Sequence, residues 1–108
     1  MNDNEQMSRE TLLEAYQKGE RQFCNMDLSE MDLSGIDLSN SDFSGSILHK
    51  TNFSGSNLTG VCFSKADLQH ATLSRAHLEA SDFGWCNVSE ADLVGADLDE
   101  APLLGPTE

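Results

Sequence analysis

Residues 26–105 divide without a gap into sixteen pentapeptides: MDLSE MDLSG IDLSN SDFSG SILHK TNFSG SNLTG VCFSK ADLQH ATLSR AHLEA SDFGW CNVSE ADLVG ADLDE APLLG. The third place is apolar in all sixteen, with eleven Leu, four Phe and one Val. The first place holds only uncharged residues, six Ala and four Ser among them. The second place is Asp eight times and Asn three times. We therefore expect the first and third places to face a core and the other three to meet water or bond the local backbone.

A period of five indicates a chain that turns in every repeat. It matches neither the 3.6 residues of a helical turn nor the two-residue alternation of a regular strand. If each pentapeptide is a short extended segment followed by a corner, the first and third residues keep the alternation of a strand. Ser, Gly, Asn and Asp suit such corners, because Gly accepts positive φ and the others hydrogen-bond nearby backbone groups. The pattern predicts a coil around a narrow apolar core.

The phenylalanines indicate a second period, of 20 residues. Phe23, Phe43, Phe63 and Phe83 are spaced by 20, and Phe53 is the remaining Phe. Four pentapeptides per coil would stack each residue on the one 20 positions later, at the strand separation of about 4.8 Å. We therefore predict a square coil in which Phe23, Phe43, Phe63 and Phe83 form a structural core ladder.

Repeats such as ADLVG, ADLDE and ADLQH resemble those of the pentapeptide repeat proteins, whose motif reads roughly A(D/N)LXX. The resemblance covers residues 26–105 and extends to the looser RQFCN of residues 21–25. It implies an all-β fold, a right-handed quadrilateral β-helix, which at this length is a solenoid of about four coils. We expect the local side-chain bonding to differ where the second place departs from the motif, at Ile47, Cys62, Thr72, His77 and Pro102.

A short capping α-helix is predicted ahead of the repeats. Ser8 is a suitable N-cap, Leu12, Leu13 and Tyr16 share one helical face, and Gly19 is a stop signal. The run LLEAYQKGERQF resembles the leader that precedes the coil in many family members, particularly those of cyanobacterial type. We expect this helix to cover the open end of the first coil, whose strand edges would otherwise associate.

The chain therefore divides into four predicted parts. They are a disordered tail over residues 1–7, the capping helix over 8–20, the β-helix over 21–105 and a C-terminal tail over 106–108. Pro102 and Pro106 cannot continue a hydrogen-bonded ladder, while Leu103 and Leu104 offer an apolar lid. Self-association through the C-terminal end of the rod is an open hypothesis.

The composition is acidic and contains no targeting signal. Among 108 residues, 19 are Asp or Glu and 6 are Lys or Arg, which gives a net charge of −13. This charge opposes binding to nucleic acid or anionic membranes, which needs basic residues. We find no membrane-spanning run and no signal peptide, and we expect a cytoplasmic protein. Cys24, Cys62 and Cys86 have no spacing typical of zinc or disulfide frameworks, so we expect no metal or other cofactor.

Stacking at 20 residues places one titratable column at a corner of the rod, made of Glu30, Lys50, His70 and Glu90. We interpret this column as a stabilising charge ladder across neighbouring strands, with pH sensing by His70 as the alternative.

A second corner places Lys65 beside Trp85. A cation–π contact between these two side chains is one interpretation. The alternative is that Trp85 is an aromatic anchor for a partner protein, because surface Trp is enriched at binding hot spots.

Charge is unevenly distributed around the predicted rod. One side carries net charge −5 with no Lys or Arg, from Asp37, Glu79, Asp97, Asp99 and Glu100. The side that carries Arg21, Asp42, Lys65 and Asp82 is neutral. The acidic side is either a solvated surface or a binding site for a basic protein surface.

We expect no catalytic activity. His49, His70 and His77 do not stand with a Ser or Cys nucleophile in a known motif, and no glycine-rich loop precedes a helix. The favoured function is a rigid protein–protein interaction or scaffold module with an unidentified protein partner. The alternative is an acidic DNA mimic that binds a DNA-binding protein such as gyrase, as implied by resemblance to the quinolone-resistance branch of the family. That branch uses a longer rod, dimerised through a C-terminal helix.

Overall fold

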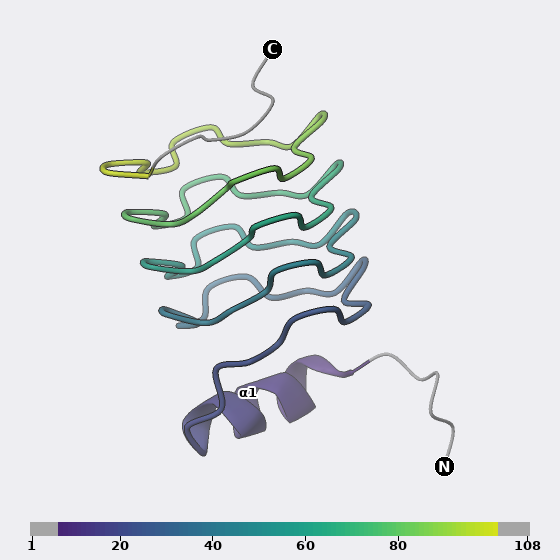
Figure 1. The fold of residues 1–108 in the computed structure, drawn as a ribbon. Coiled ribbons are helices and arrows are strands. Elements are labelled where there is room, and N and C mark those ends of the chain that lie inside the picture. Colours follow the sequence, from purple (N-terminus) through teal and green to yellow (C-terminus); the bar gives the residue numbers. More distant parts are fainter. Residues whose placement is uncertain (1–6, 102–108) are drawn as a thin grey trace.

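The chain forms a rod of stacked coils with one helix at its N-terminal end (Figure 1). The structure is a computed structural model that describes residues 7–101. Isolated parallel bridges join second-place residues 20 positions apart, as in Asp27 to Ile47, Ile47 to Asp67 and Asp67 to Asn87. Each coil therefore takes 20 residues and has four sides, one pentapeptide to a side. Two turn residues follow every bridge, so the described residues contain no longer strand.

Backbone hydrogen bonds repeat in the same pattern from coil to coil. The third-place N–H of Phe43 donates to Cys62 O at 2.8 Å, and the fifth-place N–H of Gly45 donates to Ser64 O at 2.9 Å. In the other direction, the second-place N–H of Cys62 donates to Ser41 O at 3.0 Å. Each side thus pairs its backbone groups both with the coil before it and with the coil after it, as in a parallel sheet.

The second-place side chain bonds its own corner. In Asp82 the Oδ1 atom accepts the N–H of Gly84 at 2.8 Å, an arrangement that recurs at most Asp and Asn second places. Ile47, Thr72 and His77 accept no such bond in the described residues, as expected, yet they form the same backbone bridges. The fold therefore tolerates the departures because the coil is held by main-chain pairing. The fifth predicted departure, Pro102, lies outside the described residues.

The core is a stack of buried third-place side chains with an aromatic ladder on one side. The rings of Phe23, Phe43, Phe63 and Phe83 are stacked at centroid distances of 5.6, 5.8 and 5.5 Å, with interplanar angles of 15° to 23°. Phe53, from another side of the coil, packs edge-on against Phe43 at 6.0 Å and Phe63 at 5.7 Å. The interior is narrow enough for rings from different sides to touch, which the 20-residue spacing alone does not indicate.

First-place hydroxyls cross-link the core backbone. Ser46 Oγ donates to Phe23 O at 2.8 Å, 23 residues earlier, and Thr51 makes the same kind of bond one side further on at 2.7 Å. Ser41 Oγ is buried and has no hydrogen-bond partner. The residue 23 positions before Ser41 is Lys18, which caps a helix and does not belong to a coil. The orphaned hydroxyl therefore marks the junction between helix and coil.

The last residue of every pentapeptide turns the corner in the left-handed region. All fifth places from Asn25 to Glu100 have positive φ, whether or not they are glycine. Trp85, at φ +59°, is the bulkiest residue among them. At Gly45 a Cβ atom would overlap the Oδ1 atom of Asn25, so this corner requires glycine for space as well as for φ.

Helix α1 (Arg9–Gln17) begins and ends at the predicted signals. Ser8 is the N-cap, and its Oγ atom accepts the N–H of Thr11 at 3.1 Å. Lys18 is the C-cap, and Gly19 follows with φ +100°. Leu12 is fully buried in the core cluster. The helix thus packs on the core that the first coil would otherwise leave open, as the sequence predicts.

Two α1 side chains satisfy carbonyls at the edge of the first coil. Arg9 donates through Nη1 to Asp32 O at 2.8 Å and through Nη2 to Ser34 O at 3.2 Å. Tyr16 donates its hydroxyl to Ser39 O at 2.8 Å. In later coils these second- and fourth-place carbonyls accept N–H groups from the preceding coil. Side chains of α1 therefore replace a missing coil.

Burial decreases toward the last described coil. Val88, a third-place residue, is 39% exposed, whereas the third-place residues from Leu28 to Leu78 are fully buried. Most of the predicted N-terminal tail lies outside the described residues, but Met7 is described and packs against the core, contrary to the predicted disorder. The predicted C-terminal tail of residues 106–108, and Pro102, Leu103, Leu104 and Pro106, also lie outside them. Within residues 7–101 no helix is long and apolar enough to cross a membrane.

Candidate functional site

One side of the rod gathers the five predicted carboxylates. Bridges from Asp37 to Asn57, from Asn57 to His77 and from His77 to Asp97 stack the pentapeptides 36–40, 56–60, 76–80 and 96–100, which we call the acidic face. The carboxylates on it are those of Asp37, Glu79, Asp97, Asp99 and Glu100. Glu79 is half-buried and the other four residues are exposed. The acidic face itself contains no Lys or Arg.

Glu79 is the carboxylate held most closely by its neighbours. Its Oε1 atom accepts from the hydroxyl of Thr59 at 3.4 Å, and its Oε2 atom lies 3.6 Å from His77 Nδ1. Charge counting overlooked His77, although its position 20 residues before Asp97 places it on this face. Protonation of His77 would reduce the negative charge at the middle of the acidic face.

Asp37 stands at the N-terminal end of the acidic face, close to a basic side chain. The N–H and hydroxyl of Ser39 hydrogen-bond the Asp37 carboxylate and lower its pKa, with smaller contributions from Arg21 and Tyr16. The Arg21 guanidinium is held 3.6 Å from the centre of the Tyr16 ring. Arg21 belongs to a neighbouring side, so the basic group near Asp37 is supplied from outside the acidic face.

The titratable corner column contains one ion pair. His70 Nδ1 lies 3.7 Å from Glu90 Oε1. Among the described residues, neither Glu30 nor Lys50 forms a salt bridge within 4 Å, so the predicted charge ladder is limited to this pair. The ring of His49, from the neighbouring coil, contacts that of His70 edge-on at 5.4 Å.

Trp85 is 64% exposed at another corner. The N–H of Lys65 donates to Gly84 O at 2.9 Å, which places Lys65 and Trp85 in neighbouring turns of adjacent coils. The expected cation–π contact between them does not form, because in residues 7–101 the contact of this kind is that of Arg21 with Tyr16. Trp85 therefore presents its indole without this basic partner.

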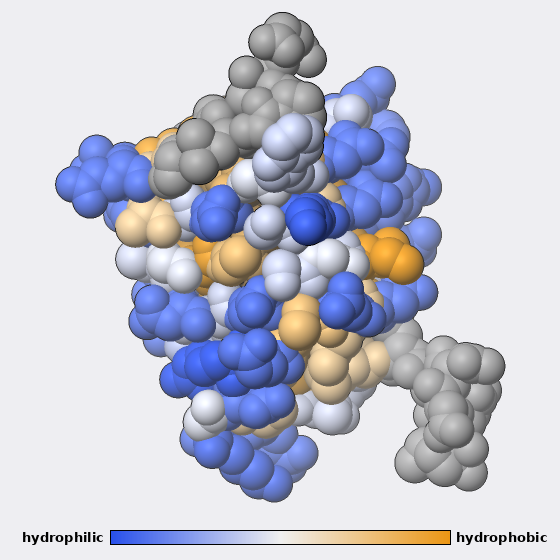
Figure 2. Space-filling model, viewed as in Figure 1, coloured by the Kyte–Doolittle hydropathy of each residue, from blue (hydrophilic) through white to orange (hydrophobic). Residues whose placement is uncertain are grey.

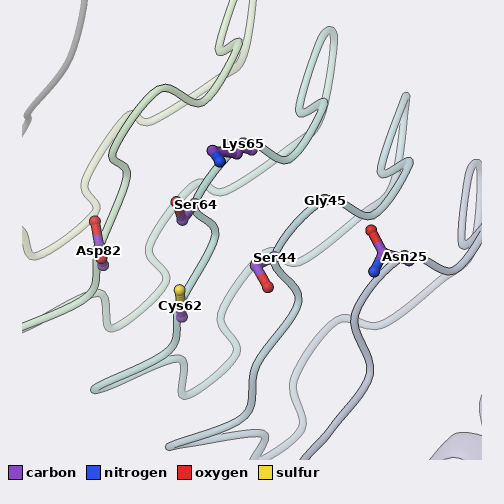
Figure 3. Close-up of a pocket in the computed structure, with 7 residues that line it drawn as sticks. All are labelled: Asn25, Ser44, Gly45, Cys62, Ser64, Lys65 and Asp82. Carbon is purple, nitrogen blue, oxygen red and sulfur yellow. The ribbon is translucent and has the colours of Figure 1, made fainter.

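A shallow hollow of about 400 Å³ lies on the same side of the rod (Figure 3). Its lining comes from successive coils and consists of Asn25, Ser44, Gly45, Cys62, Ser64, Lys65 and Asp82. Burial, with Asp42 and Asp82 nearby, raises the pKa of the Cys62 thiol, which opposes its ionisation. The hollow thus lacks an activated nucleophile at its one thiol.

The described surface shows no assembled catalytic or metal centre. Cys24, Cys62 and Cys86 are free thiols. In residues 7–101 no group of three or more His, Cys, Asp or Glu side chains is arranged to hold a metal ion. Hydrophilic residues dominate the face of the molecule drawn in Figure 2, with hydrophobic ones scattered between them. These features describe a wet, charged surface on a regular rod.

Comparison with known proteins identifies the family. A family model for the pentapeptide repeat region matches residues 20–101. The chain belongs to the pentapeptide repeat proteins. Its resemblance to that family in sequence is thereby confirmed, and its fold is that of the β-helix solenoids. No curated protein matches the chain by sequence.

Solved structures of other pentapeptide repeat proteins resemble the chain to different degrees. Alr5209 from Nostoc PCC 7120 is 32% identical with a TM-score of 0.85, over 94% of this chain and 88% of Alr5209. HetL from Nostoc sp. strain PCC 7120, which is involved in heterocyst differentiation regulation, is 29% identical over 91% of this chain, with a TM-score of 0.47. The match covers 48% of HetL. QnrB1, a plasmid-mediated fluoroquinolone resistance protein, is 18% identical over 74% of this chain and 59% of QnrB1, with a TM-score of 0.28.

Proposed function

We propose that this pentapeptide repeat protein is a non-enzymatic, bacterial protein-interaction or scaffold module. In this proposal the rod is a right-handed, four-sided β-helix of about four coils, and one of its sides binds a partner. The observation that carries the proposal is the uneven charge of the rod. The acidic face holds five carboxylates and no Lys or Arg, whereas the side with Arg21, Asp42, Lys65 and Asp82 is neutral.

The backbone of the rod holds the acidic side chains at regular positions. In the last described coil, Asp97 Oδ1 accepts the N–H of Asp99 at 3.1 Å, which fixes the corner that carries both carboxylates. The N–H of Leu78 donates to Asp97 O at 2.8 Å and ties that corner to the coil before it. A surface ordered before binding loses little conformational entropy when a partner docks. Clustered negative charge also steers a basic protein toward this side and speeds association.

Affinity capture from the native cell extract tests the proposal. The bait is the full chain, compared with the triple variant Asp97→Lys, Asp99→Lys, Glu100→Lys. The matched control places the same charge change elsewhere on the rod, with Asp27→Lys, Glu30→Lys and Asp92→Lys.

Circular dichroism first shows that both variants are folded. We expect a captured partner to be lost with the acidic-face variant and retained with the control. Equal loss with both variants would mean that net charge alone governs binding. Retention with both would remove the acidic face from consideration and direct attention to Trp85.

A second candidate function is mimicry of DNA. The net charge of −13 favours it, because a rod with this charge could occupy a DNA-binding protein such as gyrase. About four coils at strand spacing span only about 20 Å, which is short for a DNA-sized mimic. Inhibition of gyrase supercoiling by micromolar protein would support this function, and unchanged supercoiling would exclude it.

Self-association through the C-terminal end of the rod is part of the proposal. The backbone N–H groups of Val88, Leu93 and Leu98 have no acceptor within the described residues, and the Val88 side chain is 39% exposed. At the opposite end, α1 covers the corresponding edge. Sedimentation over a range of concentrations should show a dimer that Val88→Glu weakens. We also propose a cytoplasmic location, since three free thiols suit a reducing compartment.

A further inference from the structure

Two histidines from adjacent coils meet at the titratable corner. His49 belongs to the pentapeptide 46–50 and His70 to 66–70, and these two sides are joined by the hydrogen bond from Lys50 N to Gln69 O at 3.0 Å. The two imidazole rings lie 5.4 Å apart between centroids, with an interplanar angle of 82°. Their closeness follows from the register of the coils, because residues 20 or 21 positions apart are neighbours on the surface.

One of the two rings also has a carboxylate beside it. His70 Nδ1 lies 3.7 Å from Glu90 Oε1, in the next coil. A histidine that binds a metal through one ring nitrogen commonly donates the other N–H to a carboxylate, which fixes the tautomer and strengthens the ligand. Interaction of Nδ1 with Glu90 would leave His70 Nε2 free to bind an ion.

We propose that His49 and His70 bind one divalent transition-metal ion, such as Zn²⁺ or Ni²⁺, between them. Each residue supplies one imidazole nitrogen, Glu90 orients the ring of His70, and water fills the remaining coordination positions. Imidazole is a preferred ligand of zinc, nickel and copper. The site has two protein ligands, so it is distinct from the closed clusters of three or more ligands that residues 7–101 do not contain.

The ring separation fits this geometry. With a metal–nitrogen bond of about 2.1 Å, each ring centroid lies roughly 3.2 Å from the ion, so two tetrahedrally arranged imidazoles have centroids about 5.2 Å apart. The observed separation is 5.4 Å. The rings meet edge to face, so a torsional adjustment is needed to aim both nitrogens at one point. The His70 side chain is 45% exposed and His49 is half-buried, which leaves room for that adjustment.

The charges around the site partly cancel. Glu90 attracts a cation, and Glu30 adds negative charge at the far end of the column. Lys50 lies in the same column between Glu30 and His70 and repels a cation. The protein as a whole carries −13, which favours cation binding at every point of its surface. Because the ion would bridge two coils, its binding should stabilise the folded rod by mass action.

Titration of the untagged full-length protein with NiCl2, followed by calorimetry and by thermal unfolding, tests the proposal. The test variants are His49→Ala and His70→Ala. The matched control is His77→Ala, because His77 is also exposed and also lies near a carboxylate, with Nδ1 3.6 Å from Glu79 Oε2. It has no second histidine against its ring among the described residues. Nickel is preferred as the probe because it favours imidazole.

We expect one Ni²⁺ per chain and a rise in the unfolding temperature on binding. Each test variant should lower the association constant at least tenfold, and Glu90→Gln should lower it by a smaller factor. His77→Ala should stay within twofold of wild type. The proposal is overturned if millimolar Ni²⁺ does not bind, if both test variants bind like wild type, or if His77→Ala weakens binding as much as they do.

Discussion

Truncation of Phe63 is predicted to destabilise the rod more than any other single change in its aromatic ladder. Phe63 is fully buried and lies within 5.8 Å of Phe43, 5.7 Å of Phe53 and 5.5 Å of Phe83, between ring centroids. Phe83 has one ring partner and is 5% exposed. Phe63→Ala therefore removes three ring pairs, whereas Phe83→Ala removes one.

The magnitude follows from these contacts. A buried Phe→Ala substitution costs about 3–5 kcal/mol of the free energy of unfolding, through lost burial and the cavity left behind. An aromatic pair is worth about 0.5–1.5 kcal/mol beyond its area. The two additional pairs around Phe63 should make its truncation about 1–3 kcal/mol more costly than that of Phe83. We expect a loss of about 5 kcal/mol for Phe63→Ala and about 3 kcal/mol for Phe83→Ala.

Urea unfolding measures both free energies. Far-UV circular dichroism reports the whole rod and fluorescence of the single tryptophan, Trp85, reports its C-terminal part, so coincident transitions would justify a two-state treatment. Should Phe63→Ala fail to fold, Phe63→Leu offers a milder test, with an expected loss of about 1 kcal/mol. Equal losses for Phe63 and Phe83 would refute the reasoning, because ring contacts could not then determine the energetics of the ladder.

Three further predictions concern single side chains. Ser46→Ala should cost about 1 kcal/mol in urea unfolding because it leaves a buried carbonyl without its hydroxyl donor, whereas Ser41→Ala, which removes an unpartnered hydroxyl, should be neutral or stabilising. Hydrogen bonds from Ser39 lower the pKa of Asp37, so this carboxylate stabilises the fold above the pKa it has when unfolded, and the contribution disappears as pH falls through the lower folded pKa. Asp37→Asn keeps the acceptor oxygen and should make the acid-induced loss of stability, measured by unfolding between about pH 5 and about pH 2, shallower than in wild type. Burial raises the pKa of the Cys86 thiol to about 12, so Cys86 should be the last of the three cysteines to react with iodoacetamide at about pH 8, as followed by mass spectrometry.

Much of the fold could be predicted because one pattern is repeated many times. A single apolar third place says little, but sixteen in register require a core at every fifth residue. The spacing of Phe43 and Phe63 indicated which repeats are stacked, and the bridges have this 20-residue register. Departures such as Ile47 left the bridges unchanged, because main-chain groups form them whichever side chain is present.

Other contacts depend on where long side chains point, which a five-residue period does not determine. Arg9 reaches two carbonyls of the first coil, although nothing in the helix pattern indicates that use. Lys65 does not lie over the indole of Trp85, although the two are neighbours in the stacking register. Phe53 touches the ladder from another side because the coil is narrow. By contrast, the place of His77 within the acidic face could have been found from its spacing to Asp97.

The uniform backbone pairing has a consequence for how such rods change by insertion and deletion. Every pentapeptide presents the same bonding pattern to its neighbours, so gaining or losing five residues leaves the core and the ladder of hydrogen bonds intact. The same event rotates every later repeat by a quarter turn and breaks up the columns of side chains on the surface. Gaining or losing 20 residues preserves the columns and changes only the length. Selection on a surface column would therefore be visible in natural variants as a preference for length changes in whole coils.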